Sequence, residues 1–448
     1  MSRILSISIL FALLAVNGFS QAPANQQATA TADERPAQAL YEDANGYLGR
    51  RYQEFNKQNL PYDPKLEAKT KQEQKDLAVK NAETLTARKK LASDDLYYLG
   101  LLHHLAGNGD GALQTMRTFL KDTVDGDHAQ TARNVVVLYA VKKNLIGEAV
   151  ETVESYKKYQ PQRSEDLYKM EFLIADAYLR ANDYPVLAKH AENMFAAARA
   201  FAAEQKNDAF KRDDMLLKST FLLTEAYTKT DQKDAAINQL QELRRLSINL
   251  PSGNLYKQAT FRLASAFAGT DLNTIFHEPA TRNTPPEITA TEWIDLKPVK
   301  LSELRGQVVL LDFWAHWCGP CRNTFPKLSR WHEQYKDKGL VIVGLTDYLG
   351  SAEGRKMSHA EELVYLRNFK KLQKLPYGFA VADSKVNELN YGVFSIPMSF
   401  LIDRQGNVRF IASNASEPEL TRLAAMIPKL LAEPAESKTE TTAASPKN

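Results

Sequence analysis

The stretch VVLLDFWAHWCGPCRNTFP, residues 308–326, decides the fold of the C-terminal part of the chain. Its first half, residues 308–315, is a β-branched and aromatic run of the kind that forms a buried strand. Helical spacing follows from Gly319 onward. The sequence holds only two cysteines, Cys318 and Cys321, and both lie here. The stretch therefore predicts a strand that leads into a helix, with a Cys-x-x-Cys pair in the first helical turn.

This cysteine pair predicts redox chemistry. Two cysteines three residues apart in the first turn of a helix lie on one face, close enough to form a disulfide. Free backbone N–H groups and the positive end of the helix dipole would stabilise a thiolate at Cys318 and lower its pKa. We expect Cys318 to attack a substrate disulfide and Cys321 to resolve the mixed disulfide. Pro320 would stiffen the turn without removing a helical hydrogen bond.

Other uses of the pair are disfavoured. Two cysteines do not fill a tetrahedral zinc site, and the sequence has no second Cys-x-x-Cys and no histidine pair with ligand spacing. Haem attachment requires a histidine directly after Cys321, where Arg322 stands. A purely structural bridge would close a very short loop and stabilise little. We therefore expect no metal and no cofactor other than a redox-active Cys318–Cys321 disulfide.

Strands and helices alternate from residue 291 to residue 433. This alternation predicts an α/β or α+β domain with a central sheet. The expected strands are 308–315, 340–345, 379–382, 398–403 and 407–412, and the expected helices are 319–338, 361–375 and 417–431.

Two segments of this region resemble the thioredoxin family. The stretch 308–326 is similar to its active-site segment, and YGVFSIP at 391–397, followed by MSFLIDRQGNV, is similar to its cis-proline loop and last strands. An approach strand near Trp293, an insertion after Gly344 and an N-terminal export signal narrow the resemblance to the TlpA/ResA-like exported thiol–disulfide oxidoreductases. The resemblance covers roughly the C-terminal third of the chain.

The resemblance implies further site residues. Asp312 matches the family's buried carboxylate, whose raised pKa would let it accept the proton of Cys321. Pro397 matches the cis-proline that faces the cysteine pair, and the backbone of Ile396 before it would pair with an extended substrate. Trp317 matches the aromatic residue beside the nucleophile. The expected substrate-binding residues are Trp317, Gly319, Pro320, Ile396 and Pro397.

The chain also departs from these families. TlpA-like members usually carry Asn where this chain has Asp312, and the thioredoxin lysine on the following strand has no counterpart in residues 340–345. Ser395 and Met398 replace a usual Gly and Thr, which bears on substrate preference. His316 is open to two interpretations. A protonated His316 would depress the pKa of Cys318, whereas the plainer interpretation is a residue at the rim of the site.

Residues 37–269 are expected to be helical throughout. Four helical pairs are predicted, and in each the second helix begins with a small residue. This pattern resembles a degenerate tetratricopeptide (TPR-like) array, which would bind a peptide or protein on its concave face. The alternative is a helical domain that only packs on its neighbour. The pairs are 94–121, 128–161, 165–201 and 213–250, with Ala112, Ala149, Ala188 and Ala236 as the small residues.

The N-terminus predicts export. Arg3 precedes an apolar run at residues 4–16 that is too short for a comfortable membrane span, and small residues follow up to Ser20. A cleaved signal peptide at 1–20 would deliver the protein to an oxidising compartment, the periplasm or cell envelope. An uncleaved anchor and a buried helix are the alternatives. The predicted organisation continues with a disordered linker at 21–36, a helical domain at 37–275, a thioredoxin-like domain at 284–433 and a disordered tail at 434–448.

Composition excludes several classes of protein. Of 448 residues, 44% are hydrophobic and 25% charged, which are globular values. The 57 basic and 54 acidic residues give a net charge of +3, so no nucleic-acid partner is expected. The sequence therefore predicts an exported protein-disulfide oxidoreductase that acts as a reductase. Its expected partners are disulfide-bearing exported proteins, a membrane thiol-electron donor and a protein bound to the helical array.

Two other functions stay in view. The first is a scaffold or binding module in which the thioredoxin-like domain only holds partners. The second is a peroxidase, because peroxiredoxins share the fold. Their reactive cysteine follows a Pro-x-x-x-Thr-x-x-Cys pattern, whereas FWAHW precedes Cys318.

Overall fold

The computed structural model describes residues 34–204, 208–267 and 283–434. They form two compact units, which divide between Gly107 and Asn108. The predicted signal peptide and most of the predicted linker and tail lie outside the described residues. Within the described part of the chain, no helix is both long enough and apolar enough to cross a membrane.

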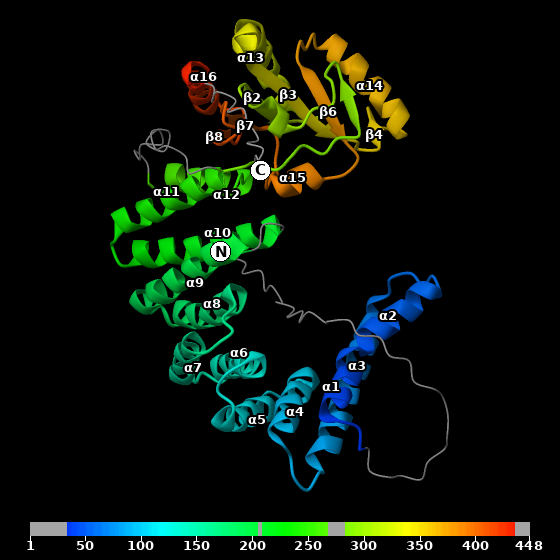
Figure 1. The fold of residues 1–448 in the computed structure, drawn as a ribbon, viewed down its shortest axis with the longest axis vertical. Helices are drawn as coiled ribbons and strands as arrows, with labels where there is room; N and C mark the ends of the chain where they lie inside the picture. Colours follow the sequence, from blue (N-terminus) through cyan, green and yellow to red (C-terminus); the bar gives the residue numbers. More distant parts are fainter. Residues whose placement is uncertain (1–33, 205–207, 268–282, 435–448) are drawn as a thin grey trace, which may run out of the picture. The chain divides into compact units, whose positions relative to one another are not determined.

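Unit 1 is a small helical assembly (Figure 1). Leu40, Leu85 and Leu102 are fully buried in its core, where α1, α3 and α4 pack together. Gly107, in the left-handed conformation, ends α4. The first predicted pair, 94–121, therefore forms two helices, but α4 packs within unit 1 whereas α5 belongs to unit 2. The helices of unit 1 are α1 (Ala37–Asn45), α2 (Tyr47–Lys57), α3 (Pro64–Thr86) and α4 (Ser93–Ala106).

Unit 2 begins with a helical array, α5 to α12, in which consecutive helices pack on one another (Figure 1). The predicted pairs 128–161, 165–201 and 213–250 are confirmed as α6–α7, α8–α9 and α10–α11. Their small residues are buried, because a methyl side chain lets paired helices approach closely. The helices are α5 (Gly109–Asp122), α6 (Asp127–Lys142), α7 (Ile146–Lys158), α8 (Ser164–Ala181), α9 (Tyr184–Glu204), α10 (Ala209–Lys229), α11 (Lys233–Asn249) and α12 (Gly253–Ala266).

The rest of unit 2 is built on a mixed sheet of the described residues, with strand order β1-β6-β3-β2-β7-β8. Strands β2, β3 and β6 run parallel, and β1, β7 and β8 pair antiparallel. Every residue of β2 is buried, as its apolar sequence predicts. The strands are β1 (Glu292–Ile294), β2 (Val308–Phe313), β3 (Leu340–Asp347), β6 (Gly378–Ala382), β7 (Met398–Ile402) and β8 (Val408–Ala412).

Helices cover both faces of this sheet. On one face α13, α14 and α16 bury residues such as Phe325, Phe369 and Leu423 against the strands. The other face carries a second core with Tyr391, beside α15. A short hairpin within the insertion after Gly344 was not predicted. The elements are η2 (Leu301–Leu304), α13 (Gly319–Tyr335), η3 (Lys336–Lys338), β4 (Ser351–Ala352), β5 (Arg355–Lys356), α14 (His359–Leu372), α15 (Val386–Asn390) and α16 (Glu417–Ala432).

The helical array completes the core on the second face. Ile248 of α11 and Tyr256 of α12 are buried together with residues of β2, β7 and β8. The Tyr256 ring lies edge-on to Phe410, 6.3 Å between centroids, and its hydroxyl accepts a hydrogen bond of 3.0 Å from Arg244. Array and sheet belong to the same compact unit, so the predicted division between residues 275 and 284 does not coincide with a division between units.

Candidate active site

The cysteine pair lies where the sequence predicts it, at the start of α13. Cys318 is the N-cap of the helix and is bonded to Cys321 in a disulfide, with 5.3 Å between the two Cα atoms. The backbone N–H of Cys321 donates to Cys318 Sγ at 3.2 Å. Cys318 is 2% exposed and Cys321 is fully buried. Because the first-turn N–H already points at Cys318, a thiolate at this position would be stabilised there.

Asp312 lies on β2, on the face that α13 covers. Side chains alternate along a strand, and Leu310 belongs to the same core cluster as both cysteines, so Asp312 points toward that cluster. It is fully buried, and burial raises its pKa to about 7, against a smaller opposing effect of a hydrogen bond from Ser399. Ser399 Oγ donates to Asp312 Oδ1 at 2.7 Å, and Oδ2 has no hydrogen-bond partner among the described residues.

Ser399 is a site residue that the sequence analysis missed. The register places it directly opposite Asp312 on β7. On the other side of Asp312, Gly344 of β3 contributes no side chain. A Cβ on Gly344 would lie 2.9 Å from the Trp314 indole nitrogen and 2.8 Å from Phe379. This crowding disfavours a side chain at position 344, and the hydroxyl of Ser399 is the hydrogen-bond partner of the carboxylate.

The loop before β7 holds the predicted proline. The Ile396–Pro397 peptide bond is cis, as expected, and Pro397 is buried. Ser395 accepts a hydrogen bond from the ammonium group of Lys257, 2.7 Å from Nζ to Oγ. Lys257 lies on α12, in the helical array, and this contact was not predicted from the sequence. The array thus touches the loop that carries the predicted substrate-binding residues.

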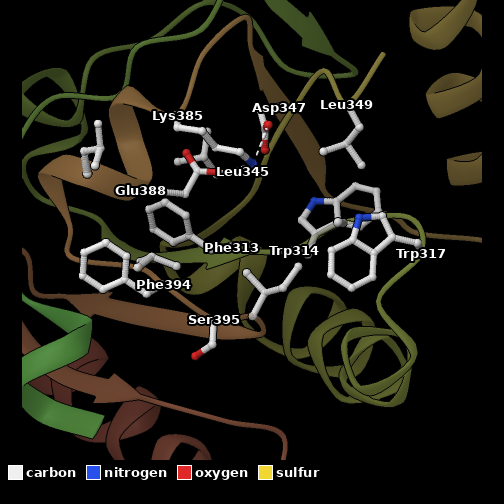
Figure 2. Close-up of a pocket in the computed structure, with 14 residues that line it drawn as sticks. Phe313, Trp314, Trp317, Leu345, Asp347, Leu349, Lys385, Glu388, Phe394 and Ser395 are labelled. Atoms are coloured by element: carbon white, nitrogen blue, oxygen red, sulfur yellow. Dashed lines mark hydrogen bonds and ion pairs between the residues drawn. The ribbon is translucent and has the colours of Figure 1, made fainter. Parts of the chain in front are cut away.

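A cavity of about 550 Å³ is lined by Trp317, the residue directly before Cys318 (Figure 2). Trp317 and Ile396, two predicted substrate-binding residues, line it together with Phe394. Trp317 is 63% exposed, and Gly319 and Pro320 are exposed at the tip of α13. The cysteines, Trp317 and the cis-proline loop are therefore all at one end of the sheet, as a site for disulfide exchange requires.

Three charged side chains line the same cavity and pair with one another. Lys385 Nζ lies 2.6 Å from Asp347 Oδ2 and 3.2 Å from Glu388 Oε1 (Figure 2). Burial and the neighbouring Asp347 raise the pKa of Glu388. Because the two carboxylates share one ammonium group, one acid is left in excess, in a cavity whose other lining side chains are mostly apolar.

The surroundings of His316 disfavour the positive charge that would be needed for it to depress the pKa of Cys318. The histidine is 5% exposed and packs edge-on against Tyr365, with ring centroids 5.2 Å apart. Burial lowers its pKa, which disfavours the protonated imidazole. This environment agrees with the plainer interpretation of His316 as a packed residue at the rim of the site. Trp314 packs between Phe325, Phe369 and Phe379, as expected of a core residue.

The sheet order, the N-terminal Cys-x-x-Cys pair of α13, the buried Asp312 and the cis-proline loop together define a thioredoxin-like redox domain. Comparison with known proteins agrees. Residues 282–411 match the AhpC/TSA family. The chain is similar to the thiol-disulfide oxidoreductase ResA of Bacillus thuringiensis subsp. konkukian, with 33% identity over 126 residues, which are 28% of this chain and 64% of that protein.

Two other proteins are similar to about a third of the chain. Protein DipZ of Mycobacterium bovis is 29% identical over 148 residues, 31% of this chain and 19% of that protein. A crystal structure of a thiol:disulfide interchange protein, thioredoxin family protein, from Chlorobium tepidum shares 23% identity with a TM-score of 0.27, and covers 34% of this chain and 98% of that one. The chain spans less than two thirds of the length of the ResA that it matches.

Proposed function

We propose that the protein is an exported thiol–disulfide oxidoreductase that reduces disulfides of protein clients through Cys318 and Cys321. The observation that carries this proposal is the disulfide at the N-terminus of α13, with Cys318 at the helix cap, where the backbone N–H of Cys321 points at its sulfur, and Cys321 inside the first turn. A nucleophilic cysteine needs a stabilised thiolate, and a resolving cysteine needs only to reach the first one.

The reaction would proceed in two exchanges. In the reduced protein, the Cys318 thiolate attacks one sulfur of a client disulfide, which breaks that bond and forms a mixed disulfide. The Cys321 thiolate then attacks Cys318 Sγ and releases the client as a dithiol. The client gains two electrons, and the protein is left with the Cys318–Cys321 disulfide that the structure contains.

Asp312 would act as the base for the second exchange. A thiol must lose its proton before it attacks, and a buried carboxylate with a pKa near 7 can take that proton at neutral pH. Its Oδ2 atom has no partner among the described residues, so one oxygen is available to accept. Ser399, which donates to Oδ1, is a positioning residue that holds the carboxylate in place.

The cellular location of this reaction and its electron donor are inferred from the sequence. The N-terminal segment 1–20 supports export to the periplasm or cell envelope, where thiols are oxidised unless electrons are supplied. A reductase there requires a thiol-electron donor, and a membrane carrier would provide it. The clients would be exported proteins that bear disulfides, and the helical array would bind a protein partner.

The alternative is a binding module in which the redox domain only holds partners. A Cys318→Ser variant distinguishes the two: an oxidoreductase loses all turnover with disulfide substrates, whereas a scaffold keeps its activity in the cell.

The reduction potential tests the proposed direction. All four tryptophans lie between residues 293 and 331, so their fluorescence reports on the redox domain during titration in thiol buffers. A value near about −270 mV supports a reductase, and a value near about −120 mV would instead indicate a disulfide-forming oxidant.

A further inference from the structure

An exposed aromatic pair joins the helical array to the cavity that Trp317 lines. Phe210, at the start of α10, packs edge-on against Phe394 of the cis-proline loop, with ring centroids 6.0 Å apart. Phe394 lines the cavity. Both rings are largely open to solvent, since Phe210 is 64% and Phe394 52% exposed. The array therefore extends the apolar rim of this cavity beyond the redox domain.

Two more exposed apolar side chains lie around the same cavity. Leu389, at the end of α15, is 51% exposed, and Trp317, next to Cys318, is 63% exposed. Figure 2 shows Phe394 and Trp317 on opposite sides of the cavity. Large apolar side chains that gather at the surface are typical of places where another molecule binds. We call Phe210, Leu389, Phe394 and Trp317 the apolar rim.

We propose that the apolar rim binds a client polypeptide that carries a large apolar side chain close to its disulfide. Phe210 of the helical array is part of this binding surface. The inference rests on the proposed function and names the substrate class of the same site.

The geometry favours a polypeptide as the occupant. The lining reaches Trp317, next to the reactive Cys318, and Ile396, next to the cis-proline. A molecule in the cavity thus lies against the residue next to Cys318 and against a loop whose backbone can pair with an extended chain. At about 550 Å³, the cavity has room for a large side chain of a bound polypeptide.

The charges favour an apolar side chain. Asp347 and Glu388 are the acidic groups of the lining, and both pair with Lys385. Since these two acids share one lysine, an anionic group on a substrate would meet an excess of negative charge, and a cationic group would have to compete with Lys385. A small charged disulfide such as glutathione disulfide therefore gains little from the cavity, whereas an aromatic or leucine side chain gains contact with Phe394, Leu389 and Phe210.

Two variants of the full chain test the role of Phe210. Phe210→Ser removes one exposed ring from the rim. Phe261→Ser is the matched control, because Phe261 lies on α12 in the same array, is 66% exposed and does not line the cavity. Each protein is assayed with dithiothreitol as reductant and three substrates: a disulfide-linked peptide with Phe beside its cysteine, the same peptide with Ser there, and glutathione disulfide.

We expect Phe210→Ser to lower kcat/KM for the Phe peptide by about 5- to 10-fold, the effect of losing part of one apolar contact. The Ser peptide and glutathione disulfide should change less than about 2-fold, and Phe261→Ser should match the wild type throughout. Equal losses on all three substrates, or equal losses in both variants, would overturn the proposal. So would unchanged peptide kinetics together with an altered oligomeric state in sedimentation, since the rim would then be a contact between copies. If the wild type turns over none of the three substrates, the proposed function itself fails, and that result is distinct.

Discussion

The two faces of the sheet are closed in different ways. The face that carries Cys318, Cys321 and Asp312 is covered by α13, α14 and α16, which all belong to the redox domain. The opposite face takes Ile248 and Tyr256 from the helical array into its core. The face with the cysteine pair is therefore closed by helices of the redox domain itself, whereas the second face and the cis-proline loop are also contacted by the helical array.

The largest effect should come from removing a side chain of the helical array that is buried on the sheet face opposite the cysteine pair. Tyr256→Ala deletes a fully buried ring that packs against Phe410, and we expect it to lower the free energy of unfolding by about 3–5 kcal/mol. Denaturant unfolding followed by tryptophan fluorescence measures this in the redox domain. Tyr156→Ala is the control, since Tyr156 is equally buried but lies in the α6–α8 core cluster. If the fluorescence transition moves no more for Tyr256→Ala than for Tyr156→Ala, the second face does not depend on the array.

The next effect concerns the pH dependence of stability on the first face. The pKa of Asp312 is raised from 3.8 to about 7, so the folded state favours the neutral carboxyl. Its contribution to stability is full below pH 4 and is lost as the pH rises through about 7. This is worth up to about 4 kcal/mol, at about 1.4 kcal/mol per pH unit.

Asp312→Asn removes that titration. Relative to the wild type, the oxidised variant should therefore gain stability between pH 4 and pH 7 and keep a constant advantage above that range. Unfolding curves of both proteins across pH 4–9 provide the measurement. A difference that does not vary with pH would show that Asp312 titrates normally.

The same substitution should slow turnover at the first face. Without the carboxylate, Cys321 loses its base, and we expect a drop of about 10²-fold in the resolving step at pH 8. The wild-type rate should rise as the pH passes about 7, where Asp312 ionises, and the Asn variant should lack this rise. Stopped-flow fluorescence of the mixed-disulfide decay measures both. Ser399→Ala, which removes the hydrogen bond to Asp312, should shift the pH profile without abolishing it.

The smallest effect tests the contact between the helical array and the cis-proline loop. Lys257→Met removes the hydrogen bond to Ser395, a loss of about 1 kcal/mol. We expect KM for a peptide disulfide to rise about 5-fold with kcat little changed. Lys257→Arg, which keeps a donor, should recover most of the affinity. A fall in kcat alone would mean that Lys257 acts on the cysteine pair and not on the loop.

Features set by local structure could be predicted from the sequence, whereas contacts between distant segments could not. The disulfide at the start of α13 could be predicted because helix geometry places neighbouring residues on one face. Pro397 could be predicted from a local motif. Ser399 could not, since its contact with Asp312 depends on the register of two strands. Lys257 and Tyr256 could not, because they reach the redox domain through the packing of α12, which no short motif encodes.

Trapping the first covalent intermediate shows whether disulfide exchange begins at Cys318. The full chain with Cys321→Ser is reduced, mixed with a disulfide-linked peptide and examined by mass spectrometry. We expect a stable one-to-one adduct on Cys318, which Cys318→Ser does not form. No adduct with Cys321→Ser, or an equal adduct on Cys321 in the Cys318→Ser protein, would contradict the assignment of Cys318 as the attacking sulfur.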